Sequence, residues 1–204
     1  MDDLEVTDGE LWNRAYDDGR AFGILFERHA KAVYNHCFRR TGSWSRAEDL
    51  TSIVFLEAWR RRRDVRLHTD TILPWLLAVA NKVLLNYSRS MRRYHRLLIK
   101  LPRTSFDSGL EDDVGNRIDD ERAMKVILAE LSHLRNEEQE VIALCNWAGL
   151  TYAEAATALG IPIGTVRSRL SRAHDHLRIR MNSESDETTR SIAYHRMNSP
   201  KEEI

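Results

Sequence analysis

Hydrophobic residues recur every three or four positions along most of this chain, which is the spacing of residues on one face of an α-helix. The clearest example is the stripe formed by Val166, Leu170, Ala173 and Leu177. No stretch alternates apolar and polar residues for long enough to predict a β-strand. The pattern therefore predicts an all-α protein whose helices end near glycine and proline.

The first half of the chain contains three predicted helices. The first begins near Phe22 and ends at the breaker sequence TGSWS, residues 41–45. The second follows directly, and we expect Ser45 and Glu48 to form a capping box at its start. Pro74 opens the third, because the first turn of a helix does not need the amide hydrogen that proline lacks. The positions expected to share related faces of the second helix are Leu50, Ile53, Val54, Glu57 and Ala58.

The second half follows a stretch, residues 101–116, in which the helical period fails and acidic and small residues take over. Two further capping boxes are predicted there, Asn136 with Gln139 and Thr151 with Glu154. The chain is thus expected to form two small helical domains joined by a flexible linker. The expected boundaries are an N-terminal tail at 1–19, a first domain at 20–98, an acidic linker at 99–121, a second domain at 122–182 and a disordered C-terminal tail at 183–204.

Residues 151–180 resolve into a short capped helix, a turn that contains Gly160 and a second helix, which is the helix-turn-helix layout. In this motif the first residues of the second helix contact base edges in the major groove of DNA. The alternative is that the charged face of the second helix is an ordinary solvated surface, but the near absence of acidic residues from that helix favours contact with DNA. The inner face of the first helix is predicted to comprise Tyr152, Ala155, Ala156 and Leu159. The outward face of the second is predicted to comprise Thr165, Arg167, Ser168, Arg169, Ser171 and Arg172.

Charge is distributed in blocks, although the formal net charge is +0. Every charged side chain in 82–103 is basic, all but Arg117 in 107–121 are acidic, and only Asp175 is acidic in 165–180. Opposed blocks of this kind predict separate surfaces for separate partners. Two interpretations remain for the run Arg60–Arg63: it is either a solvated helix end or a contact to a DNA phosphate. Trp75 is expected in the core rather than stacked on a base.

Several classes of protein find no support in the sequence. The acidic N-terminus lacks the apolar segment of a signal peptide, and no run reaches the roughly 18 apolar residues of a membrane span. We therefore expect a cytoplasmic protein with no direct membrane insertion. Cys37 and Cys145 are interpreted as buried hydrophobes rather than as a disulfide.

No cofactor, metal site or catalytic residue is expected either, so the chain is not predicted to be an enzyme. His174 and His176 are two residues apart and lie on different helix faces, unlike a helical zinc pair. His29, His36 and Cys37 are interpreted as ordinary helix residues rather than as a metal cluster.

Three motifs resemble those of extracytoplasmic-function (group IV) sigma factors of the sigma-70 family. LTYAEAATALGIPIGTVRSRLSRAHDHLR, at 150–178, resembles their region 4, in which a G-T-V-[RK]-S-R motif opens the second helix. AEDLTSIVFLEAW, at 47–59, is similar to regions 2.1–2.2, and LPWLLAVANKVLLNYSRSMRR, at 73–93, to regions 2.3–2.4. The motifs occur in the family's order and spacing over about 160 residues.

The resemblance implies a protein that binds core RNA polymerase, at its β′ clamp and β flap, and directs it to promoter DNA. The implied −35-contacting residues are Thr165, Arg167, Ser168, Arg169 and Arg172. The implied −10-contacting residues are Lys82, Asn86, Arg89, Arg92 and Arg93. Glu48, Asp49 and Ser52 would face the clamp, with Leu50 in the same helix and Phe55 and Trp59 packed beneath. The segment 64–73 would capture an unstacked base, and the acidic segment 104–121 would follow the RNA exit path.

The resemblance also implies an anti-sigma factor that clamps the two domains together. Two residues depart from the family pattern, Ser52 where glutamine is usual and Lys82 where asparagine is common. Ser52 is therefore expected to weaken one contact to the clamp, and Lys82 is expected to alter the reading of the promoter. A stand-alone helix-turn-helix repressor or activator is the rival interpretation, but it leaves the motifs at 47–93 unexplained.

Overall fold

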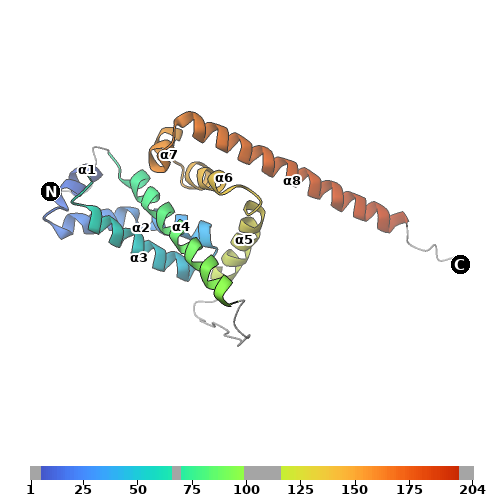
Figure 1. Cartoon of the computed structure of the whole chain (residues 1–204), viewed down its shortest axis with the longest axis horizontal. Helices are drawn as coiled ribbons and strands as arrows, with labels where there is room; N and C mark the ends of the chain where they lie inside the picture. The colour runs from blue at the N-terminus through green and yellow to red at the C-terminus, as the bar shows by residue number, and fades with distance from the viewer. Residues whose placement is uncertain (1–5, 66–69, 99–115, 198–204) are drawn as a thin grey trace.

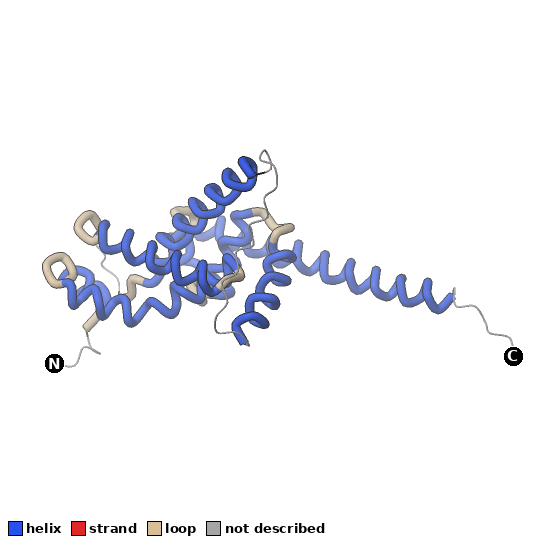
Figure 2. The backbone as a smooth tube through the Cα atoms, turned by 90° about the horizontal axis from the view of Figure 1, so that it is seen from below, coloured by secondary structure: helices blue, strands red, loops and turns tan. Residues whose placement is uncertain are grey.

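The computed structural model is all-helical over the residues that it describes, 6–65, 70–98 and 116–197, which confirms the predicted fold class (Figure 1). Two groups of helices each enclose a core, and the C-terminal part of the long last helix projects away from both (Figures 1 and 2). In chain order the helices are α1 (Asp8–Arg14), α2 (Gly19–Thr41), α3 (Trp44–Arg61), α4 (Leu73–Leu98), α5 (Asn116–Leu131), α6 (Asn136–Val141), the π-helix η1 (Ile142–Trp147), α7 (Tyr152–Leu159) and α8 (Ile163–Met197).

The first core lies among α1, α2, α3 and α4, each of which contributes one apolar face. The expected helix boundary at residues 41–45 is confirmed, because Gly42 ends α2 with φ of 62° in the left-handed region that glycine tolerates. Pro74 lies in the first turn of α4, as predicted. The fully buried side chains of this core include Leu11, Leu25, Val33, Cys37, Val54, Ile72 and Leu76.

Residues 8–14 form α1 rather than part of an N-terminal tail. Thr7 caps the helix, because its hydroxyl accepts from the Glu10 N–H at 3.3 Å while the Glu10 carboxylate accepts from the Thr7 N–H at 3.1 Å. Leu11 and Trp12 are buried at 0 % and 1 % exposure. A seven-residue helix is too short to show a helical period, so the tail prediction for 1–19 is wrong here.

A buried carboxylate, Asp8, ties α1 to the rest of the first core. It accepts hydrogen bonds from Arg28 at 3.1 Å and from the Ile72 N–H at 3.0 Å, and it lies 2.5 Å from His29 Nε2. Burial by itself raises the pKa of Asp8, but the Ile72 N–H, His29 and Arg28 together hold that pKa below its usual value. Asp8 thus joins α1, α2 and the start of α4 as an ionised group.

The start of α3 differs from the predicted capping box of Ser45 and Glu48. Ser43 is the N-cap and its side chain makes no capping hydrogen bond. The Trp44 N–H donates instead to Glu121 of α5 at 2.8 Å. A carboxylate from a distant part of the chain therefore satisfies one of the free amides at the start of this helix.

The second core lies among the end of α5, α6, η1, α7 and α8. Thr151 and Glu154 form the predicted capping box, with hydrogen bonds of 3.2 and 2.8 Å. The box predicted for Asn136 and Gln139 is wrong, because α6 begins one residue earlier. Its N-cap is Arg135, whose N–H donates to the Glu138 carboxylate at 3.1 Å. The buried side chains include Leu131, Leu134, Val141, Leu144, Leu150, Val166, Leu170 and Ala173.

Helices replace parts of two segments that were expected to be irregular. α5 begins at Asn116, so 116–121 of the expected linker is helical, and 99–115 lies outside the described residues. α8 continues to Met197, so the tail expected to be disordered at 183–204 is helical as far as 197. Between Gly164 and Pro200 the sequence contains no glycine or proline, so nothing there ends the helix.

The two cores are in contact. Leu77 of α4 is fully buried within the second core, and Trp147 of η1 packs against both. α7 lies on α4, and η1 lies on α2. We refer to this boundary, with Leu77 and Trp147 at its centre, as the interdomain seam.

We predict that Leu11→Ala destabilises the full chain by about 2–5 kcal/mol, because it removes a completely buried side chain and leaves a cavity. Denaturant unfolding measures the loss. The control is Asn13→Ala, an exposed position of the same helix, which should change stability by no more than about 0.5 kcal/mol. Equal stability of the two variants would show that α1 contributes nothing to the fold.

Candidate nucleic-acid and polymerase interface

The α7–α8 pair has the predicted helix-turn-helix geometry. Gly160 ends α7 with φ of 65°, and the chain turns into α8 within three residues. Val166, Leu170 and Ala173 are buried at 0 %, 6 % and 0 % exposure, which confirms the apolar stripe of the second helix. Tyr152 does not belong to the inner face of α7, because 42 % of it is exposed.

The opposite face of α8 carries the residues that the motif assigned to DNA. Thr165 and Arg169 are half-buried and the other three are exposed. The Arg167 guanidinium lies 5.8 Å from the centre of the Tyr152 ring. Ser168 donates its hydroxyl to the Thr165 carbonyl at 3.1 Å, and Arg172 donates to the Ser168 carbonyl at the same distance. The exposed members are Arg167, Ser168 and Arg172.

Arg169 is distinguished from its neighbours by a nearby carboxylate, that of Glu140. Burial raises the pKa of Glu140, whereas Arg40 and Arg169 lower it and Glu137 raises it. Part of the positive charge of Arg169 is therefore balanced within the protein. Arg167 and Arg172 are more exposed than Arg169, and they carry most of the outward charge of this face.

The second half of α4 forms a basic surface, and all five residues assigned to it are exposed. Lys82, Asn86, Arg89 and Arg93 are spaced four, three and four residues apart, which places them on one helix face, and Arg92 lies beside them. Leu76, Ala80 and Leu84 fill the opposite face, at 0 %, 0 % and 4 % exposure. A cavity of about 510 Å³ is lined by Asn86, Arg89, Arg92, Arg93 and Arg96.

Arg96 extends this basic surface, although it was not among the predicted residues. It follows Arg93 by three positions and is exposed. The same spacing rule that grouped the other residues would have found it.

Glu48, Asp49 and Ser52 lie together on the exposed face of α3. Ile53 and Leu56 continue that face, each 48 % exposed, so Ile53 lies apart from the buried Leu50, Val54 and Ala58 with which it was grouped. Acidic and large apolar side chains thus share one surface. Phe55 and Trp59 of α3 both pack against α2: the ring centre of Phe22 lies 6.3 Å from that of Phe55 and 5.1 Å from that of Trp59.

Both helical domains match known protein families in sequence. Residues 25–101 match Sigma-70 region 2 and residues 124–177 match Sigma-70, region 4. ECF RNA polymerase sigma factor SigL of Mycobacterium tuberculosis is 30% identical over 159 residues, which cover 76% of this chain and 85% of that protein.

The chain belongs to the ECF RNA polymerase sigma factors. SigE of Mycolicibacterium smegmatis, another ECF RNA polymerase sigma factor, is 32% identical over 82% of this chain, and the match spans 64% of that relative's length. The two regions follow one another in the order that the sequence motifs predicted.

Solved structures share the fold of this sigma factor. CnrH, in complex with the cytosolic domain of CnrY, matches with a TM-score of 0.64 and 22% identity over 86% of this chain and 97% of that one. The sigma factor RpoE of Bartonella quintana, in complex with the anti-sigma factor NepR, matches with a TM-score of 0.55 and 19% identity over 80% and 98% of the two chains.

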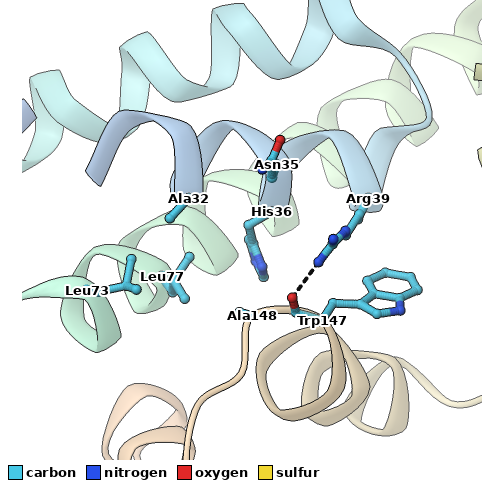
Figure 3. Close-up of a pocket in the computed structure, with 8 residues that line it drawn as sticks. All are labelled: Ala32, Asn35, His36, Arg39, Leu73, Leu77, Trp147 and Ala148. Carbon is cyan, nitrogen blue, oxygen red and sulfur yellow. Dashed lines mark hydrogen bonds between the residues drawn. The ribbon is translucent and has the colours of Figure 1, made fainter. Parts of the chain in front are cut away.

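The interdomain seam of this sigma factor encloses a cavity of about 200 Å³ (Figure 3). Arg39 of α2 reaches across it and donates a hydrogen bond to the Trp147 carbonyl. Leu73 and Leu77 of α4 line another side. Polar and apolar contacts therefore both connect region 2 to region 4.

His36 lies at this seam and is almost completely buried. Its Nε2 lies 2.9 Å from the Asn81 side-chain oxygen, and its Nδ1 has no hydrogen-bond partner among the described residues. Burial lowers the pKa of His36 to about 4, the Asn81 hydrogen bond raises it, and Arg40 and Arg39 lower it. His36 is consequently neutral at pH 7.

Two further histidines of the described chain contact buried carboxylates, and the two cysteines are not bonded to each other. His29 contacts Asp8, and His176 Nδ1 lies 3.3 Å from Glu138. Cys37 is a buried free thiol, as predicted, and burial raises its pKa to about 11, whereas Cys145 is also free but only half-buried. Among the described residues no three His, Cys, Asp or Glu side chains converge on one point, and none of the helices could cross a membrane.

We predict that acidification destabilises the sigma factor through His36. The unfolded histidine takes up a proton near pH 6.5 and the folded one only near pH 4, so stability falls as pH decreases through this window. At pH 5 the loss from this one residue is about 2 kcal/mol.

Denaturant unfolding at pH 7 and pH 5 measures this loss. His36→Gln should reduce the difference between the two pH values, while His133→Gln, at an exposed histidine, should leave it unchanged. An undiminished pH dependence in His36→Gln would contradict the prediction.

Proposed function

We propose that this protein binds core RNA polymerase and directs it to promoters by contacting a −35 element with α8 and a −10 element with α4. The observation that carries the proposal is the pair of basic helix faces, each opposite an apolar stripe buried in its own core. Membership of the ECF sigma factors supports the same function. The site of action would be the cytoplasm, where promoter DNA and polymerase meet.

For the −35 element, the start of α8 enters the major groove. Arg167 and Arg172 project from the exposed face, and arginine can donate two hydrogen bonds to one guanine. Thr165, Ser168 and Arg169 lie between and beside them. The Ser168 and Arg172 contacts to α8 carbonyls hold these side chains along the helix in the absence of DNA. In this arrangement Arg167 reads a base and its neighbours position the backbone.

For the −10 element, the α4 surface of Lys82, Asn86, Arg89, Arg92 and Arg93 binds phosphates and bases as the strands separate. Its arginines lie side by side along the helix, which suits a continuous backbone of negative charge. Asn86, among the charged residues, can hydrogen-bond to a base edge. Lys82 lies nearest the segment 64–73, of which 66–69 lies outside the described residues.

For core RNA polymerase, the proposed contact is the α3 surface of Glu48, Asp49 and Ser52 together with Ile53 and Leu56. Apolar side chains next to carboxylates fit a partner helix that presents both apolar and basic groups, and we propose that this partner is the β′ clamp. Region 4 would contact the β flap. An anti-sigma factor is proposed as a further partner, supported by the complex of the similarly folded RpoE with NepR.

We predict that Arg167→Ala weakens −35-dependent transcription about 10-fold or more while binding to core polymerase is retained. Run-off transcription on promoters with intact and substituted −35 elements measures the effect. The control is Arg178→Ala, which removes an exposed arginine farther along α8 that pairs with Asp175 at 2.9 Å. An equal loss in both variants would show that general charge, rather than base contact, accounts for the effect.

We predict the opposite result for Asp49→Ala: a core-polymerase affinity lower by about 10-fold, because an interfacial ion pair is lost. Fluorescence anisotropy of the labelled protein with core polymerase measures the affinity. Asp175→Asn is the control, since this exposed carboxylate lies on α8. Unaltered affinity of Asp49→Ala would place the polymerase contact elsewhere on the molecule.

A further inference from the structure

The cavity at the interdomain seam is separate from the proposed contacts to DNA and polymerase, because none of the residues assigned to those contacts lines it. Its volume of about 200 Å³ is larger than the roughly 150 Å³ of an engineered protein cavity that binds benzene. The space therefore admits a small organic molecule. Its walls come from both regions: Ala32, His36 and Arg39 lie on α2, Leu73 and Leu77 on α4, and Trp147 and Ala148 at the end of η1 (Figure 3).

Arg39 brings a positive charge to the cavity without a carboxylate to balance it. It donates to the Trp147 carbonyl, a neutral group (Figure 3). Within the described ranges it forms no ion pair, whereas its neighbour Arg40 has the Glu140 carboxylate nearby. A guanidinium has five N–H groups, and two of those that remain can hold both oxygens of one carboxylate. This wall therefore favours an anionic ligand.

His36 adds a buried hydrogen-bond acceptor. Only 3 % of the residue is exposed, and its ring lies between Leu77 and Ala148 (Figure 3). Nε2 lies 2.9 Å from the Asn81 side-chain oxygen, so it carries the single N–H of the uncharged ring, and Nδ1 keeps its lone pair. Nδ1 has no partner in the described part of the chain. Because a buried polar atom without a partner costs stability, a ligand that donates to Nδ1 is favoured.

The two polar groups can serve one molecule. His36 and Arg39 are three residues apart on α2, which makes their side chains neighbours on one helix face. The wall formed by Leu73 and Leu77 is apolar and suits a hydrocarbon body. Inorganic phosphate could pair with Arg39 but would leave this apolar wall without a partner. A small molecule with a carboxylate, a hydroxyl and an apolar body satisfies all three walls.

We propose that the seam cavity binds a small hydroxylated organic acid. Its carboxylate pairs with Arg39, its hydroxyl donates to His36 Nδ1, and its apolar body packs against Leu73 and Leu77. The ligand contacts region 2 and region 4 at once, so its binding stabilises the arrangement in which the two regions touch. The site thus makes this sigma factor responsive to a small molecule, and binding requires neither DNA nor polymerase.

Isothermal titration calorimetry of the full-length protein with mandelate tests the proposal. We expect a Kd below about 1 mM for mandelate. Phenylacetate lacks the hydroxyl and benzyl alcohol lacks the carboxylate, so each should bind about 10-fold less tightly, and inorganic phosphate should bind more weakly still. Absence of mandelate binding, or equal binding of all four probes, would overturn the proposal.

Two variants locate the bound ligand. Ala32→Leu fills part of the cavity and should abolish mandelate binding, whereas Ala129→Leu, at an exposed position of α5, should retain it. Arg39→Gln should weaken mandelate about 10-fold and benzyl alcohol much less, and its control is Arg46→Gln, an exposed arginine of α3 that does not line the cavity. Wild-type affinity in both Ala32→Leu and Arg39→Gln would place the ligand elsewhere and refute the site.

Hydrogen exchange tests whether the ligand connects the two regions. Mandelate should slow amide exchange at 73–77 and at 144–148 in the wild type and in Ala129→Leu, but not in Ala32→Leu. Binding that leaves exchange at both segments unchanged would contradict a ligand held at the seam. Failure of the protein to direct polymerase to any promoter would refute the proposed sigma function alone, because these binding measurements contain no polymerase and no DNA.

Discussion

The burial of one face of each basic helix is the constraint on which the rest of the molecule depends. In α8, Val166 and Ala173 are completely buried, and in α4, Leu76 and Ala80 are. Since an amphipathic helix can turn only one face to its core, these contacts determine which side chains point outward. Arginine is common on any exposed helix surface, but in α4 and α8 the arginines lie opposite the buried apolar stripes. The proposed DNA contacts therefore follow from hydrophobic packing as much as from charge.

The interdomain seam adds a second constraint, because it relates the two basic surfaces to each other. Leu77 inserts into the second core, Trp147 touches both, and Arg39 bonds to the Trp147 carbonyl. This boundary also contains a cavity and the buried Nδ1 of His36, which has no hydrogen-bond partner in the described part of the chain, so its packing is incomplete.

The sequence predicted the long helices, the helix-turn-helix and the surfaces of α3, α4 and α8, because a helical period repeated over several turns is a strong signal. It failed where a contact from elsewhere decides local structure. Glu121 contacts the free amide at the start of α3, and Arg62 after α3 donates to the carbonyl of Ala15 at the end of α1, a helix too short to be recognised. Periodicity located the apolar stripes but not where each stripe ends, so Tyr152, which is 42 % exposed, was wrongly assigned to the inner face of α7.

The central claim is that these basic surfaces select a start site only when core RNA polymerase carries the protein. The most direct measurement compares binding to a promoter fragment by the protein alone, by core polymerase alone and by both together, with transcript start sites mapped for the mixture. The account predicts stable, sequence-specific binding and a unique start only for the mixture. Equally tight and specific binding by the protein alone, with no selective initiation when polymerase is added, would contradict it.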